Sequence, residues 1–170
     1  SGEGTYFAFA EALKTRTIDW SSDGRIRNGT QAVIAAKSAQ EKDAAVKALS
    51  AYLRDEKMQY DPSVIIMDIL DKNGIVIVSS REDRIGIDEL KEEQEFGAHH
   101  FSKTIGADFG KAFVASSVFE PDEHMNAMIH VTARIFSNDR NENGKLLPLD
   151  AVLLIHFDRM DDLGRVLNGA

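Results

Sequence analysis

The chain of 170 residues contains no cysteine, and this absence removes several kinds of site at once. Disulfides, thiolate metal ligands and cysteine nucleophiles are all excluded. A cysteine-free chain is compatible with the cytoplasm and also with the exterior of a bacterial or archaeal cell. Apolar runs of 18 residues are missing too, so no segment is expected to span a membrane. No signal-peptide pattern is visible either.

Positive charge is scarce relative to negative charge. The chain has 20 Lys and Arg against 28 Asp and Glu, a net charge of −8, and a pI near 5.1. This balance argues against a nucleic-acid surface or a polybasic membrane patch. An acidic ligand would need a local arginine. The apolar fraction of 43% and the charged fraction of 28% are typical of a globular protein, and the length predicts one domain over residues 1–170.

Signatures of catalysis are also absent from the sequence. It contains no G-x-S-x-G, P-loop or G-x-G-x-x-G motif, and its Asp and Glu residues show no catalytic spacing. Nothing in the sequence therefore demands an enzyme.

The stretch from Pro62 to Leu90 predicts a β-hairpin followed by an exit from the sheet. Two apolar runs, 63–70 and 75–80, flank the turn 71–74, which ends in Asn73-Gly74. Asn-Gly between β-branched runs is a strong hairpin signal, because both residues tolerate positive φ.

The remaining elements follow from hydrophobic periodicity and turn residues. Helices are expected within 5–57, the second over 25–37 and the third with Ala45, Leu49, Tyr52 and Leu53 on its apolar face. Trp20 lies in helical register, which favours a core position. Further helices are expected in a crossover, 83–110, where Asp88 would cap residues 89–96 and a second segment would cover 98–105. Strands are expected at 111–119, 125–136 and 151–157, a turn at 139–144, and a closing helix at 160–167.

These elements predict an α+β fold with a central five-stranded, mostly antiparallel sheet. Residues 1–60 would form helices on one face, 61–158 the sheet with its crossover, and 159–170 the terminal helix.

Alternation along the strand 125–136 separates an apolar face from a mixed face. Ile129, Val131, Ala133 and Ile135 point one way, while Met128, His130, Thr132, Arg134 and Phe136 point the other. The last strand divides similarly, with Leu153, Ile155 and Phe157 opposite Val152, Leu154 and His156. The mixed face is either solvated or the wall of a ligand pocket beneath the crossover.

The pocket interpretation has a set of candidate ligand-binding residues. Arg134 would anchor a carboxylate, since its planar guanidinium suits bidentate pairing. Asp68 lies in an apolar strand, where it either faces solvent or, if buried, must be paired. The other candidates are His130, Thr132, Ser80, His100 and Phe101.

Residues 139–150 contain a possible calcium motif. Asp139, Asn141, Asn143 and Asp150 fit D-x-[DN]-x-[DN]-G with an acidic residue at position twelve. The helix–loop–helix context is missing, and position twelve is Asp rather than Glu. The alternative is a polar turn between two strands.

Three segments resemble the extracytoplasmic Cache domain, the PAS-like sensor of bacterial and archaeal histidine kinases, chemoreceptors and cyclic-dinucleotide enzymes. They are DWSSDGRIRNGT (19–30), DPSVIIMDILDKNGIVIVSSREDRIGIDEL (61–90) and KLLPLDAVLLIHFDRMDDLGRVLNG (145–169). The pattern D-x-x-G-x-V-x-x-S-S…x-I-G-x-D corresponds here to Asp71, Gly74, Val76, Ser79, Ser80, Ile85, Gly86 and Asp88.

This resemblance implies a non-enzymatic extracytoplasmic sensor that binds a small molecule in a pocket on the sheet face away from a long N-terminal helix. It also implies a homodimeric receptor, most simply a sensor histidine kinase, attached to the membrane through flanking helices outside this sequence. The alternative is a PAS-like interaction domain that dimerises without a ligand. One departure is Pro148, which stands where the family has glycine, so the last hairpin is expected to be irregular.

Overall fold

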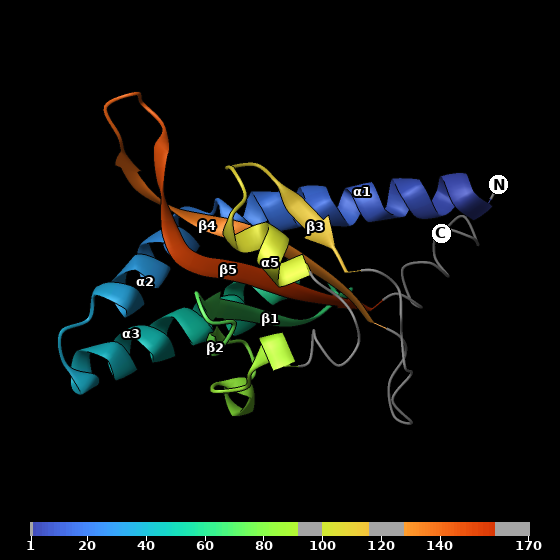
Figure 1. The fold of residues 1–170 in the computed structure, drawn as a ribbon. Coiled ribbons are helices and arrows are strands. Elements are labelled where there is room, and N and C mark those ends of the chain that lie inside the picture. The colour runs from blue at the N-terminus through green and yellow to red at the C-terminus, as the bar shows by residue number, and fades with distance from the viewer. Residues whose placement is uncertain (1, 92–99, 116–127, 159–170) are drawn as a thin grey trace.

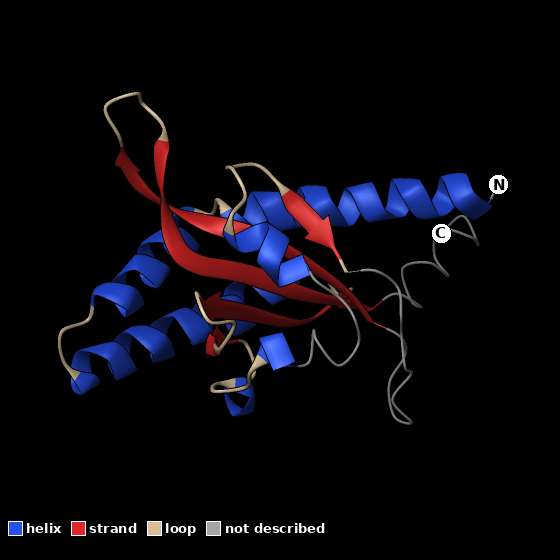
Figure 2. Cartoon of the chain, in the orientation of Figure 1, coloured by secondary structure: helices blue, strands red, loops and turns tan. Residues whose placement is uncertain are grey.

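A five-stranded antiparallel sheet with helices packed on it organises the chain. The computed structural model describes residues 2–91, 100–115 and 128–158. The strand order is β2-β1-β5-β4-β3, so the last strand in sequence lies at the centre (Figure 1). Helices and sheet form separate layers (Figure 2), which confirms the predicted α+β, PAS-like fold. Within these residues, no helix is both long and apolar enough to cross a membrane.

The N-terminal helices form one layer. They are α1 (Gly2–Ser21), α2 (Gly24–Ala35) and α3 (Ala39–Ala51), continued by the π-helix η1 (Tyr52–Lys57) and the 3-10 turn η2 (Met58–Tyr60). Asp23 caps α2 by accepting from the amides of Arg25 and Ile26, and Ser38 caps α3 by accepting from Glu41. The predicted second helix is therefore confirmed to within two residues at its end.

Asp23 also ties α2 to the π-helix. Its second carboxylate oxygen accepts from Tyr52 Oη at 2.8 Å and from Lys57 Nζ at 3.0 Å. Lys57 and Arg16 lie 5.0 and 5.3 Å from the ring centre of Trp20, which is buried as predicted. One carboxylate thus connects the start of α2 to η1.

The predicted hairpin is present as β1 (Val64–Asp71) and β2 (Val76–Ser79). Its turn differs from the expected Asn-Gly geometry, because Gly74 has a φ of +79° and no described non-glycine residue has positive φ. The Asp71 carboxylate closes the turn instead, accepting from the amides of Asn73 at 2.8 Å and Ile75 at 3.0 Å.

The predicted end of the strand 125–136 and the predicted start of the strand 151–157 were wrong. β4 (Met128–Arg140) and β5 (Leu146–Asp158) continue as a long hairpin beyond the sheet (Figure 1). Pro148 is tolerated because β5 pairs with β1 only from Ala151 onward, so the proline needs no amide toward β1. The register shifts on both sides of the Phe136–Pro148 pair, which confirms the expected irregularity.

The crossover and β3 are described in part. The crossover contains η3 (Glu82–Arg84), a helical segment at 89–91 and α5 (His100–Ile105). Asp88 accepts from the Lys91 amide at 3.1 Å, as its predicted capping role requires. β3 is Ala112–Val114, and residues 116–119 of the predicted strand lie outside the described ranges. Residues 92–99, 116–127 and 159–170 lie outside the described ranges, and with them the predicted closing helix.

The two faces of the sheet bury different sets of side chains. The helix-facing core takes the predicted apolar face of β4, namely Ile129, Val131, Ala133 and Ile135. The face covered by the crossover has a smaller apolar cluster of Leu70, Val76, Phe101, Val152 and Leu154. Polar side chains on this second face are therefore enclosed between the sheet and the crossover.

Candidate functional site

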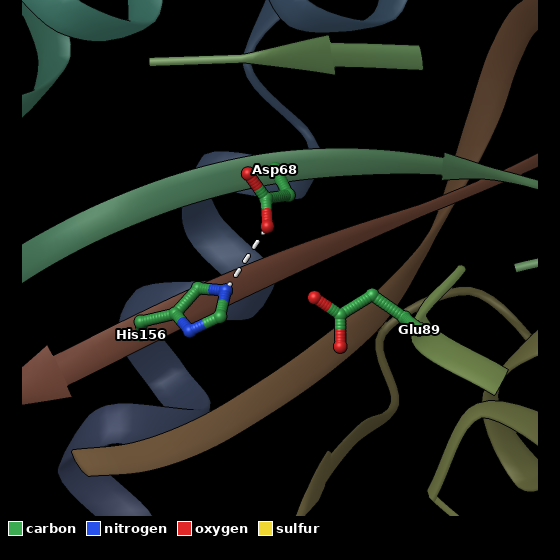
Figure 3. A group of neighbouring side chains, drawn as sticks. All are labelled: Asp68, Glu89 and His156. Atoms are coloured by element: carbon green, nitrogen blue, oxygen red, sulfur yellow. Dashed lines mark hydrogen bonds and ion pairs between the residues drawn. The ribbon is translucent and has the colours of Figure 1, made fainter. Parts of the chain in front are cut away.

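Asp68 is the centre of a buried polar cluster on the crossover-covered face. Its carboxylate accepts from Ser79 Oγ at 2.6 Å and from Arg84 Nε at 3.0 Å, and it lies 3.0 Å from His156 Nε2 (Figure 3). Burial by itself would raise the pKa of Asp68. The hydrogen bond from His156, together with the charges of His156 and Arg84, outweighs burial and lowers this pKa below its ordinary value.

Arg84 joins this carboxylate to a second one on the crossover. Its Nη2 lies 2.9 Å from Asp68 Oδ2 and also pairs with Glu89, whose side chain points toward Asp68 and His156 (Figure 3). Asp68, Glu89 and His156 are all buried, and one polar atom from each lies within 4.8 Å of the others. Since Arg84 pairs with both carboxylates, the cationic position belongs to this guanidinium rather than to a metal. We call Asp68, Ser79, Arg84, Glu89 and His156 the charged cluster.

The segment that carries Arg84 and Glu89 is fixed by backbone hydrogen bonds. The Val76 amide donates to Ile87 O, the Gly86 amide to Val76 O, and the Glu89 amide to Gly74 O, at 2.8 to 2.9 Å. Residues 84–89 are therefore held against the β1–β2 hairpin independently of their side chains.

Three imidazoles continue the cluster across the sheet toward α5. His156 Nδ1 lies 3.1 Å from His130 Nε2, and the ring centres of His130 and His100 are 6.4 Å apart. Burial, followed by the charge of His156, lowers the pKa of His130 well below its ordinary value and that of His100 to about 4. His100 Nδ1 is buried and has no hydrogen-bond partner among the described residues. We call His156, His130 and His100 the imidazole row.

The helix α5 contacts the sheet through side chains. Thr104 Oγ1 and Thr132 Oγ1 are 2.6 Å apart, and Phe101 packs with Val152 and Leu154. In the described ranges, no backbone hydrogen bond joins α5 to a strand. Its attachment thus differs from that of the fixed segment 84–89.

Arg134 lies on the same face of the sheet, outside the charged cluster. Its Nε donates to Leu149 O at 3.1 Å, while Nη2 is 3.7 Å from the mostly exposed carboxylate of Asp150. Burial lowers its pKa, and the charge of Asp150 partly opposes this effect. No described residue accepts a hydrogen bond from either Nη atom. The guanidinium is half-buried yet has donors to spare.

The structure brings several predicted site residues together and places others apart. Asp68, His130 and His100 meet through the imidazole row, and Thr132 and Phe101 lie at the contact with α5. Ser80 instead accepts from the Met67 amide at 3.0 Å at the end of the sheet. The ligand-binding roles of all seven residues stay predictions.

Sequence reasoning missed four members of the charged cluster: Ser79, Arg84, Glu89 and His156. Asp68 is the sequence feature that could have pointed to these partners, since a carboxylate in an apolar strand requires partners when it is buried. Arg84, only 16 residues later, is a basic residue on the chain segment that leaves β2 and returns over the sheet.

The tip of the β4–β5 hairpin contains the predicted calcium motif. Asn141 Oδ1 accepts from the amides of Asn143 and Lys145 at 2.9 and 3.0 Å, as in a polar turn. Asp150 faces Arg134 on the neighbouring strand. A calcium ion at Asp139, Asn141, Asn143 and Asp150 stays a prediction.

A separate groove of about 330 Å³ lies in the helical layer between α2 and α3. Small residues such as Gly29, Ala32 and Ala45 line it. It belongs to the opposite side of the sheet from the charged cluster and is not the pocket that the sequence predicted.

Comparison with known proteins finds similarity in structure alone. No family model and no curated protein matches the chain. The chain is similar to the sensor domain of E. coli DcuS, with 15% identity and a TM-score of 0.43 over 98% of this chain and 96% of that one. It is also similar to an extracellular ligand-binding receptor from Desulfohalobium retbaense, with 12% identity and a TM-score of 0.44 over 96% of this chain.

A third similar structure is the extracellular domain of rpHK1S-Z16, described as a histidine kinase, with 13% identity and a TM-score of 0.36 over 88% of this chain and 59% of that one. These solved structures are extracellular sensor domains, the class that the sequence resemblance indicated. This chain spans about a quarter of the length of the Desulfohalobium receptor. At these identities the similarity concerns the fold alone.

Proposed function

We propose that the chain is a sensory input domain, not itself catalytic, of a membrane-attached extracytoplasmic receptor. A small carboxylate would bind on the crossover-covered face of the sheet, with Arg134 as its anchor. The proposal rests on the difference between the two guanidiniums on this face, those of Arg84 and Arg134.

Arg84 is saturated by protein carboxylates, whereas Arg134 is not. Arg84 pairs with Asp68 and Glu89, both buried. Arg134 donates through Nε to a backbone carbonyl and has only a distant, exposed carboxylate near Nη2. A half-buried guanidinium with spare parallel donors favours a bidentate anion.

Aromatic surface lies next to this guanidinium. Arg134 is 5.9 Å from the ring centre of Phe136, and Phe109 packs edge-on against Phe136 at 5.6 Å between centres. Phe109 is 49% exposed. Small-molecule sites combine apolar walls with few polar anchors, so an organic carboxylate suits this surface better than an inorganic anion does.

Ligand binding would act on the receptor through β4. This strand carries Arg134 on one face and packs against α1 with the other, through residues such as Ile135. A ligand that prefers one position of β4 relative to α1 shifts the equilibrium by its differential affinity alone. The displacement would reach a kinase or related output through flanking membrane helices, within a homodimer.

Thermal unfolding in the presence of small mono- and dicarboxylates tests the proposal, with the matching amides as controls. A ligand at about 100 times its Kd should raise Tm by roughly 5 to 10 °C. Arg134→Gln should abolish the shift, while Arg140→Gln, an exposed arginine on the same strand, should retain it. The proposal fails if no carboxylate raises Tm or if Arg134→Gln responds like the wild type.

A ligand-free interaction domain is the second candidate. The mutual pairing of Asp68, Arg84 and Glu89 favours it, since the charged cluster needs no guest to balance Arg84. Sedimentation equilibrium of the ligand-free protein distinguishes the two: a stable dimer together with no carboxylate response supports this alternative.

A further inference from the structure

We propose that the imidazole row makes this domain a proton sensor, in which uptake of a second proton by the row releases α5 from the sheet. The ligand would be the proton itself, and the moving part would be the segment 100–105. This inference does not depend on carboxylate binding at Arg134 and is tested without any carboxylate.

The imidazole row can hold one proton with its charge balanced by the charged cluster. Two carboxylates, Asp68 and Glu89, and one guanidinium, Arg84, leave the charged cluster with one net negative charge. An imidazolium at His156 balances it, because its Nε2–H faces Asp68 Oδ2 at 3.0 Å and its Nδ1–H faces His130 Nε2 at 3.1 Å. In that state His130 accepts a hydrogen bond and is neutral.

A second proton would have to be held by His130 or His100. Burial most strongly opposes a proton on His130, the charges of His156, His100 and Arg84 oppose it further, and Asp68 favours one. Asp68 is already shared among Ser79, Arg84 and His156, and Glu89 is engaged by Arg84. A buried cation without its own counterion is strongly unfavourable, so the second imidazolium requires access to water.

Because, among the described residues, α5 is attached to the sheet only through side chains, it is the element that detaches. Residues 84–89 are held by backbone hydrogen bonds to the hairpin, whereas α5 is held by the Thr104–Thr132 contact and by burial of Phe101. Release of α5 exposes His100 and one side of His130 while the charged cluster keeps its pairs. Local opening of this kind costs less than global unfolding.

The direction of the effect follows from linkage. In the released state the imidazole of His100 has a pKa near the ordinary value of about 6.5, and in the docked state its pKa is lowered to about 4. The released state therefore binds protons first. The docked state has its full stability above pH 6.5 and loses it as the pH falls, by up to about tenfold in population per pH unit for each proton taken up.

Native-state hydrogen–deuterium exchange measures the release directly, after correction for intrinsic exchange at each pH. The opening constant of residues 100–105 should rise about tenfold from pH 6.0 to pH 5.0. The amides of Gly86 and Glu89, which are hydrogen-bonded in the fixed segment, serve as the internal reference and should change less than about twofold. Equal changes in both segments, or no change in α5, would overturn the proposal.

Two substitutions remove the titrating groups while keeping their packing. His100→Phe retains an aromatic ring, and His130→Gln retains an acceptor for the His156 Nδ1–H. The double variant should lose the pH dependence of α5 exchange; a double variant with the wild-type slope contradicts the proposal.

Should that variant not fold, imidazole carbon shifts of the wild type supply the decisive measurement. His130 should remain neutral as long as the α5 amides are protected. Titration of His130 near pH 6.5 with α5 still protected would also overturn the proposal.

Discussion

His156 Nε2 and Asp68 Oδ2 lie 3.0 Å apart, although the two residues are 88 positions apart in sequence. Asp68 pairs with Leu154 on β5, and His156 pairs with Ile66 on β1, so the two are diagonal neighbours on one face. A one-residue slip of β1 against β5 would place the two side chains on opposite faces of the sheet. Their contact therefore selects the register of the two central strands.

Replacing Asp68 should be costly because it leaves Arg84 and His156 without their shared carboxylate in a buried site. Asp68→Asn removes the charge that Arg84 and His156 share, and we expect a loss of roughly 3 kcal/mol or more in the free energy of unfolding. Urea denaturation measures this loss. Asp55→Asn, which breaks the exposed pair with Arg54, is the matched control and should leave Tm unchanged. Comparable effects of the two substitutions would contradict the buried pairing.

Acid should weaken the fold before the carboxylates titrate. The pKa of His100 is lowered to about 4, so the unfolded chain binds its proton first as the pH falls below 6.5. Stability is then complete above that pH and declines below it, by up to roughly 2 kcal/mol at pH 5 from His100 alone. Urea denaturation at pH 7.5 and 5.0 should show this decline, and His100→Phe should reduce it. An equally steep decline in His100→Phe would assign the effect elsewhere.

Two glycines with nearly the same backbone conformation should respond differently to alanine. Gly74 has a φ of +79°, and a Cβ there would lie 2.6 Å from Leu90 Cγ; Gly144 has a φ of +78° with nothing within 4 Å. We expect Gly144→Ala to cost about 1 kcal/mol from backbone strain. Gly74→Ala should cost roughly 2 to 3 kcal/mol, since the side chain of Leu90 must also move. Equal losses in the free energy of unfolding, measured by urea denaturation, would show that the Leu90 side chain moves aside without an energetic penalty.

Asp23 should contribute more to the stability of the fold than an ordinary helix cap does. Asp23→Ala removes the cap of α2 together with the hydrogen bonds from Tyr52 and Lys57. We expect a loss of roughly 2 to 3 kcal/mol, against about 1 kcal/mol for Ser38→Ala, which removes a cap alone. Thermal unfolding of the two variants provides the comparison. If Asp23→Ala costs no more than Ser38→Ala, the link to the π-helix adds no stability.

Hydrophobic alternation predicted the sheet well, because a face buried along its length constrains every second residue. The apolar face of β4 and the two faces of β5 are assigned as expected. Strand ends were less predictable. Beyond Phe136, β4 and β5 pair mainly with each other outside the core, where polar residues such as Asn138 and Asp139 suit a strand as well as a turn.

The charged cluster could not be predicted from the sequence, because its contacts join residues on different strands and segments, which no local sequence pattern specifies. His156 was assigned to the mixed face but not paired with Asp68, since their contact requires β1 and β5 to be neighbours. Glu89 was interpreted only as part of a helix start. Its position is set by Arg84, which bridges it to Asp68 on the sheet.

The central position of β5 has a consequence for synthesis of the protein. β1 leaves the ribosome early, yet its partner β5 begins at Leu146 and ends at Asp158. Until these residues emerge, β1 and β4 each present an unpaired edge, and the carboxylate of Asp68 lacks His156. Nascent chains stopped before Leu146 should therefore aggregate or bind chaperones, whereas chains that extend past Asp158 should close the sheet in one late step.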